Sequence, residues 1–381
     1  MKPNPLVTLP LLALAAAVAI AGCASNGAQT PPANGGAAEG ASRSPAQAAA
    51  ASANAPSAPA GAEGTPSSES SEHPEPETTR IKIIDFSDSI HAGTIRLTEK
   101  LGFFEQEGLT LDILSTSGGA QAAPALLNKD VYFAEIAYSH VFKFKQKNQP
   151  LIALAQTMDD LGMFVSYGNE WIEKTGIGAG STLEEKVLAL KGARIGVTSV
   201  GSLTDETIRY FLKRFGLDPE QDVLITGVGG NHLLTALEAG SVDVSVGFSH
   251  FPEYIEYKGV GQTLIRSRDV PELQHITNIV IAANEEWAAE HPNTVRAFLR
   301  AISRTFEYMK SNPENALAAA REAWPEVPPE VLEAAVKNRL EVTPDSLAIP
   351  EDGARRNLQW LLDAGSLAEP VDVGGTYDHG Y

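Results

Sequence analysis

The sequence Arg80-Ile81-Lys82-Ile83-Ile84-Asp85-Phe86 opens the stretch that decides the fold. It has the pattern of a short strand, and the chain continues with an expected helix over residues 93–104, a strand over 109–114, a helix through 125–127 and a strand over 131–137. About 111 residues later the same order recurs, with expected strands and helices over residues 193–198, 204–215, 223–226, 233–239 and 242–246. A stretch that occurs twice in this order predicts two similar lobes of the βαβ type.

The repeat extends to individual residues. Thr94-Ile95-Arg96 corresponds to Thr207-Ile208-Arg209, and Gly102 corresponds to Gly216. At a spacing of 111 residues, the second unit repeats Gly118-Gly119, Ala125-Leu126 and Val131 as Gly229-Gly230, Ala236-Leu237 and Val242. Ser139-His140 recurs as Ser249-His250 at a spacing of 110. Agreement in this order along the whole unit supports the two-lobed reading.

Two crossings are expected to join the lobes, over residues 163–167 and 276–283. The rest of the chain is predicted to be mostly helical, with a first helix capped by Asn293 and others over residues 314–323, 329–340 and 351–364. We therefore predict an α/β fold in which residues 80–167 and 276–381 form lobe I and residues 168–275 form lobe II.

The composition limits the possible functions. The 381 residues include 29 Lys and Arg against 48 Asp and Glu, a formal net charge of −19. A nucleic-acid binder needs basic patches that replace phosphate counterions, so this balance argues against nucleic acid as a partner. The single cysteine, Cys23, rules out an internal disulfide, a Cys-based zinc site and a Cys-rich redox centre. We expect no metal and no other cofactor.

The first residues have the features of an export signal. The apolar run from Leu6 to Ala21 is interrupted only by Thr8 and Pro10, and it is shorter than the roughly 20 residues that span a membrane. Residues 1–22 are therefore predicted to be a signal peptide. Ile20-Ala21-Gly22-Cys23 resembles the cleavage box of bacterial lipoproteins, where the cysteine is lipidated. The alternative is an ordinary cleaved signal with an incidental cysteine.

The segment that follows lacks the residues of a hydrophobic core. Residues 24–79 contain no Val, Ile, Leu, Met, Phe, Tyr or Trp. Such a composition cannot bury enough apolar surface to fold, so residues 23–79 are predicted to be a disordered linker. The chain would then consist of a lipid anchor, a linker and a folded body outside the cytoplasm.

Several motifs of the body resemble those of one family. The motifs are Leu101-Gly102-Phe103-Phe104-Glu105-Gln106-Glu107-Gly108-Leu109, then Gly118-Gly119 with Ala125-Leu126-Leu127 and Asp130-Val131, then Gly201-Ser202-Leu203-Thr204, and finally residues 236–243. Together they are similar to the nitrate/sulfonate/taurine and thiamine-pyrimidine binding proteins of ABC importers, over about residues 80–300. This resemblance implies a type II periplasmic-binding-protein fold, with two lobes, two crossovers and a ligand cleft between them.

Motifs of catalysis do not occur in the body. Gly247-Phe248-Ser249-His250-Phe251 fails as a nucleophile elbow at its last position. Residues 176–181 lack the lysine of a phosphate loop, and residues 227–232 end in His232 where a dinucleotide fingerprint needs glycine. A related enzyme branch that makes the thiamine pyrimidine carries a cysteine-rich motif, whereas this chain has no cysteine after Cys23. We therefore predict that the protein is not an enzyme.

The predicted ligand site consists of strand-to-helix turns, because ligands of open α/β sheets bind beyond the carboxyl ends of the strands. Free backbone N–H groups at the following helices suit an anion. For Ser202, a plain N-cap with Asp205 completing a capping box is an alternative or additional role. The predicted ligand-binding residues are Ser89, His91, Ser117, Gly118, Gly119, Ser139, His140, Ser199, Gly201, Ser202, Thr204, Gly229, Gly230, Asn231, Ser249 and His250.

Three kinds of side chain have open roles. The histidines at predicted turns of the cleft are His91, His140, His232 and His250. They have three possible roles: contact with the ligand, a plain solvated or helix-capping role, or a metal site. Ser139-His140 and Ser249-His250 are expected to face each other across the cleft. Asp159-Asp160 reads as an exposed turn, or as a contact to an amine if it faces the cleft. Trp171 and Trp287 are expected to pack near the crossings.

We therefore predict a lipid-anchored solute-binding protein of an ABC importer, attached to the bacterial cell membrane on its outer side. The expected ligand is a small organic anion resembling sulfonate, taurine or nitrate, bound between the lobes by hinge closure, and the expected partner is the membrane permease. A thiamine-pyrimidine precursor is the alternative ligand, because Ile90-His91-Ala92-Gly93 resembles the "NHxG" segment of the pyrimidine-binding branch. A surface receptor without a transport role is a second alternative. We expect a monomer.

Overall fold

The computed structural model describes residues 73–85, 89–115 and 121–381. Cys23, the signal peptide, most of the predicted linker and the turn Ser117-Gly118-Gly119 lie outside these residues. The stretch from Glu69 to the end of the chain forms one unit by its internal contacts. Within that unit the strands form two separate sheets of five strands each.

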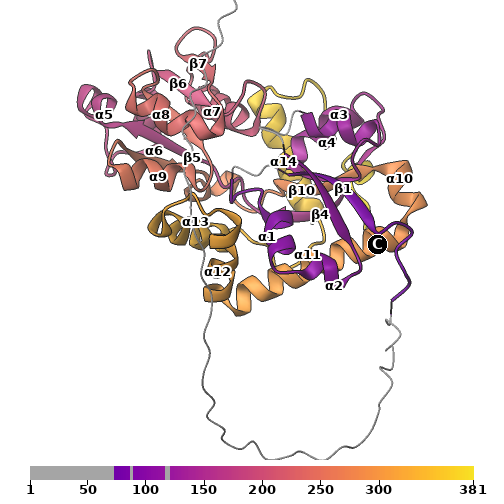
Figure 1. Ribbon diagram of the computed structural model, residues 1–381. Helices are drawn as coiled ribbons and strands as arrows, with labels where there is room; N and C mark the ends of the chain where they lie inside the picture. The colour runs from indigo at the N-terminus through magenta and orange to yellow at the C-terminus, as the bar shows by residue number, and fades with distance from the viewer. Residues whose placement is uncertain (1–72, 86–88, 116–120) are drawn as a thin grey trace, which may run out of the picture. The chain divides into compact units, whose positions relative to one another are not determined.

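Sheet A carries the first copy of the repeat (Figure 1). Its strands are, in spatial order, β2 (Thr110–Ser115), β1 (Arg80–Asp85), β3 (Phe133–Ala137), β10 (Ile279–Asn284) and β4 (Leu151–Met158). β1 pairs in parallel with β2 and β3, whereas β10 runs antiparallel to β3 and β4. The helices of this part of the chain are α1 (Thr94–Lys100), α2 (Phe103–Gln106), α3 (Ala122–Leu127) and α4 (Tyr138–Lys145).

Sheet B repeats the same topology with the second copy. Its strands are, in spatial order, β7 (Leu224–Gly227), β6 (Arg194–Val197), β8 (Val244–Gly247), β5 (Phe164–Gly168) and β9 (Gly261–Arg266). As in sheet A, the first strand of the repeat, here β6, pairs in parallel with β7 and β8. β5, which precedes the repeat in the chain, runs antiparallel to β8. The helical segments are α5 (Asn169–Thr175), α6 (Leu183–Leu188), α7 (Leu203–Arg214), η2 (Gly230–His232), α8 (Leu233–Glu238), α9 (Phe251–Lys258), η3 (Ser267–Asp269) and η4 (Pro271–Leu273). The prediction of two α/β lobes is confirmed.

The position of the first crossing differs from the prediction. We expected residues 163–167 to lead out of lobe I and the boundary to follow residue 167. In the structure β5 is already part of sheet B, where it pairs with β8 and β9, so the chain crosses before Phe164. All five residues of β5 are buried, and a short buried strand has the same sequence pattern in either sheet.

The end of the predicted linker is also part of the body. Glu77 accepts hydrogen bonds from the backbone N–H groups of Asn293 (3.0 Å) and Thr294 (2.7 Å), and the carbonyl of Thr79 accepts one from Thr110. The helix α11 (Pro292–Ser311) therefore takes its N-terminal acceptor from Glu77 and not from Asn293, whose side chain binds Arg296. Both the linker boundary at residue 79 and the predicted Asn293 cap are wrong.

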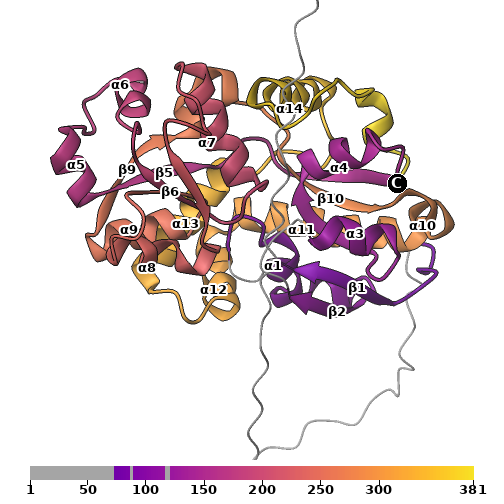
Figure 2. The ribbon, with the colours of Figure 1, turned by 90° about the horizontal axis from the view of Figure 1, so that it is seen from above.

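The C-terminal third is helical, as predicted. It contains α10 (Glu285–Glu290), α11, α12 (Pro313–Ala323), α13 (Pro329–Glu341), α14 (Glu351–Ala364) and the turn η5 (Val373–Thr376). α14 packs on α4 of lobe I and on α7 of lobe II, and α13 packs on α9 of lobe II (Figure 2). A continuous buried cluster that includes Tyr138, Ile195, Tyr210 and Trp360 runs from one lobe into the other. No helix within residues 73–85, 89–115 and 121–381 is both long and apolar enough to cross a membrane.

Candidate functional site

The turn after β1 meets the turn after β8 across the two lobes. The Ser89 hydroxyl donates to the carbonyl of Ser249 (2.8 Å), and the backbone N–H of His91 donates to the same carbonyl (3.2 Å). The imidazole of His91 stacks on the ring of Phe248, with centroids 4.8 Å apart and planes 18° from parallel. Three predicted site residues are therefore in contact across the boundary between the lobes.

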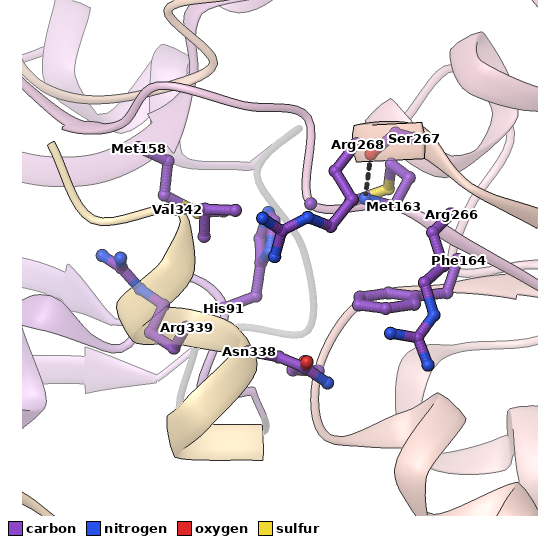
Figure 3. A pocket seen from close by; sticks show the side chains of 12 residues that line it. His91, Met158, Met163, Phe164, Arg266, Ser267, Arg268, Asn338, Arg339 and Val342 are labelled. Carbon is purple, nitrogen blue, oxygen red and sulfur yellow. Dashed lines mark hydrogen bonds between the residues drawn. The ribbon is translucent and has the colours of Figure 1, made fainter. Parts of the chain in front are cut away.

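The His91 side chain lies in a buried pocket close to the crossings. Figure 3 shows it at the centre, with Arg339 of α13 and Val342, the residue after that helix, on one side and Met163 and Arg268 on the other. The cavity itself is about 20 Å³, room for roughly one water molecule. Burial lowers the pKa of His91 to about 3, and the positive charge of the nearby Arg339 makes a smaller contribution in the same direction. The imidazole is therefore neutral at pH 7. Among the described residues, nothing forms a hydrogen bond with its Nε2 atom.

Gly162 allows the His91 ring to occupy this position. Its φ of +60° is a conformation that residues with a side chain rarely adopt. A β-carbon at Gly162 would lie 2.8 Å from Cε1 of His91, well inside van der Waals contact. The loop between β4 and β5 therefore needs glycine both for its backbone and for its approach to the imidazole.

A second contact between the lobes joins α4 to α7. Lys143 forms an ion pair with Glu206, and Ser139 lies near enough to the Glu206 carboxyl to affect its pKa. The Glu206 side chain is 2% exposed. Burial raises its pKa, although Lys143 and Ser139 act in the opposite direction. Burial and the neighbouring Lys143 lower the pKa of His140 to about 4.

The turn between β6 and α7 holds a cluster of hydroxyl groups. The Thr198 hydroxyl lies 3.0 Å from those of both Ser202 and Thr204, and Ser202 donates to the carbonyl of Ser199 (2.7 Å). Ser202 is the residue before the helix, but its side chain accepts no hydrogen bond from the backbone N–H groups of the first turn. Asp205 instead accepts from the backbone N–H of Gly201 (2.7 Å), so the capping box does not form.

Two of the helix N-termini that sequence analysis assigned to an anion, those of α1 and α7, already have carboxylates nearby. At α1, one oxygen of the buried Glu135 accepts from the backbone N–H of Thr94 (2.9 Å) and of Ile95 (3.4 Å). At α7, Asp205 and the buried Glu206 lie in the first turn. A bound anion at either place would be close to an existing negative charge, which is unfavourable.

The predicted residues thus separate into groups. Ser89, His91 and Ser249 meet each other; Ser139 meets Glu206 of the opposite lobe; and the β6 and β7 turns adjoin, since the N–H of Gly229 donates to the carbonyl of Thr198 (3.0 Å). Each Ser-His pair lies against the opposite lobe, but Ser139 and Ser249 have different partners. His250 is buried, with a pKa lowered by burial to about 4. Gly201 and Asn231 are exposed, and so is His232, a histidine whose role was left open and which is not among the predicted ligand-binding residues.

Some residues of the interface were missed or misjudged. Asp160 is buried and not exposed; it accepts hydrogen bonds from Gly162 N–H (3.0 Å) and the Ser267 hydroxyl (3.2 Å), and burial raises its pKa. Glu253, four residues after Ser249 on α9, was missed although the helical spacing from Ser249 could have identified it. Asn338 comes from α13, and no local pattern connects that helix with the lobes.

The two tryptophans have the packing role that was predicted. Trp171 is buried, and its Nε1 donates to the carbonyl of Ala189 (3.0 Å). Trp287 stacks on Tyr132 with ring centroids 4.6 Å apart. In the part of the chain that the structure describes, no three or more His, Cys, Asp or Glu side chains are grouped so that they could hold a metal ion.

The chain belongs to the NMT1-like family, whose model matches residues 74–343. It is 25% identical over 235 residues to the 4-amino-5-hydroxymethyl-2-methylpyrimidine phosphate synthase of Candida albicans (strain WO-1), covering 59% of this chain and 63% of that protein. It is 21% identical to the putative binding protein YtlA of Bacillus subtilis (strain 168), covering 71% and 79%. The chain thus spans less than two thirds of the Candida enzyme.

Solved structures are similar along most of the chain. A protein of Bordetella bronchiseptica RB50 matches with a TM-score of 0.71 and 25% identity, over 81% of this chain and 97% of that one. The alkanesulfonate-binding protein SsuA of Xanthomonas axonopodis pv. citri, bound to MOPS, matches with a TM-score of 0.62 and 14% identity, over 79% and 99%. The periplasmic-binding-protein fold and the predicted family resemblance are both confirmed.

Proposed function

We propose that the chain is an extracytoplasmic solute-binding protein of an ABC importer, which closes its two lobes on a small flat solute. The solute class that the geometry favours is a heterocycle that donates hydrogen bonds, such as an aminopyrimidine. This reverses the order of the two ligands considered from the sequence. Lipidation of Cys23 and delivery of the solute to a membrane permease belong to the same proposal.

One observation carries the choice of solute: a buried acceptor at the interface lacks a donor. Among the described residues, Oε2 of Glu206 has no hydrogen-bond partner although the atom is buried. An unpartnered buried acceptor costs about 1–3 kcal/mol, so a solute that supplies N–H groups would stabilise the closed form. The carboxylates at the starts of α1 and α7 favour the same class, because they repel an anion.

The relatives are compatible with this solute class. The Candida relative is named for a phosphate of an aminopyrimidine, and Ile90-His91-Ala92-Gly93 resembles the segment of the pyrimidine-binding branch. A binding role is favoured over an enzymatic one because YtlA and SsuA are named as binding proteins and because no cysteine follows Cys23.

A small organic anion is the second candidate. Arg266 and Arg268 line the pocket beside His91, and SsuA is named for alkanesulfonates. Arg339, which lines the same pocket, is less available, because its guanidinium donates to Thr94 (2.9 Å), Thr157 (2.9 Å) and Thr343 (2.7 Å).

A binding screen of the full chain tests the proposal. The probes are 4-amino-5-hydroxymethyl-2-methylpyrimidine, an alkanesulfonate, taurine and nitrate, each measured by thermal shift and then by calorimetry. At about 100 times its dissociation constant the true solute should stabilise the protein by roughly 2.7 kcal/mol. Binding of the sulfonate alone would select the second candidate. Binding of none of the four, with no permease gene beside this one, would favour a surface receptor.

A matched pair of variants then tests the site. His91→Ala should weaken binding of the aminopyrimidine about two- to tenfold, the effect of losing one neutral hydrogen bond. His232→Ala is the control, because His232 follows a strand of lobe II but is exposed. Equal affinities of the two variants would remove His91 from the site.

A further inference from the structure

Helix α13 forms a third side of the interface between the lobes. It packs on α12, which packs on α1 and α11, and it also packs on α9 of lobe II. Asn338 and Arg339 of α13, and Val342 directly after it, line the pocket of His91 (Figure 3). Arg268 of lobe II forms an ion pair with Glu341 of α13. A segment outside both copies of the repeat therefore closes the site.

The carboxyl group of Glu253 connects α13 with the turn after β8. One oxygen, Oε1, accepts a hydrogen bond from the hydroxyl of Ser249 (2.5 Å) and another from the Asn338 amide (2.6 Å). The carbonyl of the same serine accepts the two bonds from Ser89 and His91 of lobe I. Ser249 is therefore fixed through its side chain by Glu253 and through its carbonyl by lobe I.

Three of the charged groups around Glu253 are engaged elsewhere. Glu256 of α9 accepts from the backbone N–H of Thr263 (3.1 Å), Arg266 of β9 lies over the ring of Phe164, and Glu341 of α13 pairs with Arg268. Lys337 of α13 lines the groove in which Glu253, Glu256 and Arg266 also lie. Among the described residues no cation forms an ion pair with Glu253. Burial raises the pKa of Glu253, and Ser249 and Asn338 act against that rise.

We infer that Glu253 and Asn338 are a positioning pair for closure of the lobes. Their hydrogen bond forms when α9 meets α13, and it orients Ser249 so that its carbonyl can receive Ser89 and His91. The pair acts through Ser249, while solute contact is left to other groups. This inference rests on the proposed function for its biological meaning, but the closure itself can be measured without knowing the solute.

The test compares variants of one hydrogen bond in the full chain. Asn338→Asp places a second carboxylate beside Glu253 and removes the donor, so it should favour the open form. Glu253→Gln keeps an oxygen that accepts from Ser249 and Asn338, so it should close like the wild type. Glu333→Ala is the control, since Glu333 is exposed on the same helix. Closure is read from the distance between spin labels at Asp130→Cys and Gln221→Cys, one in each lobe, in a Cys23→Ser background.

The expected result is a larger label-to-label distance for Asn338→Asp, with wild-type distances for Glu253→Gln and Glu333→Ala. The affinity for 4-amino-5-hydroxymethyl-2-methylpyrimidine should fall about tenfold or more in Asn338→Asp, the effect of losing a hydrogen bond to a charged group. An unchanged distance distribution in Asn338→Asp would overturn the inference, even if its melting temperature fell. If the distances respond as expected but the wild type does not bind the pyrimidine, the positioning pair stands and the proposed solute is wrong.

Discussion

Replacing Lys143 with glutamine should open the lobes in a way that depends on pH. Lys143 of α4 is the cation that pairs with Glu206 of α7, so this ion pair spans the interface. The Lys143 side chain is 26% exposed and that of Glu206 only 2%. In the closed form of Lys143→Gln, Glu206 must therefore remain buried without a cation, whereas in the open form water can solvate it.

The size of the effect follows from the cost of protonating Glu206. Breaking a buried ion pair by removing one partner costs about 3–5 kcal/mol. The closed form of Lys143→Gln cannot be destabilised by more than the free energy of protonating Glu206, because the protonated side chain carries no charge. That free energy is about 1.4 kcal/mol for each pH unit above the ordinary glutamate pKa of 4.5. That limit is about 3.4 kcal/mol at pH 7 and about 1.4 kcal/mol at pH 5.5. The closing equilibrium should thus fall by up to about 300-fold at pH 7 and only about tenfold at pH 5.5.

The assay is the distance between labels at Asp130→Cys and Gln221→Cys, measured at pH 7 and at pH 5.5. The double variant Lys143→Gln with Glu206→Gln is the control, because two neutral side chains leave no buried charge and closure should return. A Lys143→Gln protein that closes as well as the wild type at pH 7 would refute the reasoning. So would an opening that is equally large at both pH values.

Three further predictions concern the anchor, the start of the body and its histidines. Cys23→Ser should release the protein from membranes, since the lipidated cysteine is the proposed anchor; a variant that still pellets with membranes contradicts this. Deleting residues 26–72 should leave the melting temperature unchanged, whereas Glu77→Ala should lower the free energy of unfolding by about 1 kcal/mol, because it removes the acceptor at the start of α11. His140→Gln should flatten the dependence of stability on pH. The folded-state pKa of His140 is about 4, below its ordinary 6.5, so stability is complete above pH 6.5 and is lost towards pH 4 at up to about 1.4 kcal/mol per pH unit. The free energy of unfolding is measured by denaturant titrations at several pH values. If its dependence on pH were the same in His140→Gln as in the wild type, His140 would be protonated or accessible in the folded protein.

The internal repeat made the fold predictable, because each copy carries its own strand and helix periods and its own turn glycines. The limits appear where one element depends on a distant one. β5 has a buried pattern that suits either sheet, and only its pairing with β8 and β9 assigns it to lobe II. The start of α11 has Asn293 in a capping position, but Glu77 supplies the acceptor from 216 residues away.

The site was predictable as a set of turns but not as a set of charges. Ser89, His91 and Ser249 were expected from the strand ends, and they do meet. The occupancy of the helix N-termini could not be foreseen, because Glu135 reaches α1 from a neighbouring strand. The role of Asn338 depends on how α13 packs against lobe II, which no spacing in the sequence encodes.

The most direct test of the central claim is a titration of the full chain with 4-amino-5-hydroxymethyl-2-methylpyrimidine while the distance between the two lobes is recorded. We expect one molecule to bind per chain and the distance between labels at Asp130→Cys and Gln221→Cys to shorten in step with binding. Binding without any change in that distance would contradict hinge closure. Shortening caused by an alkanesulfonate and not by the pyrimidine would contradict the proposed solute class.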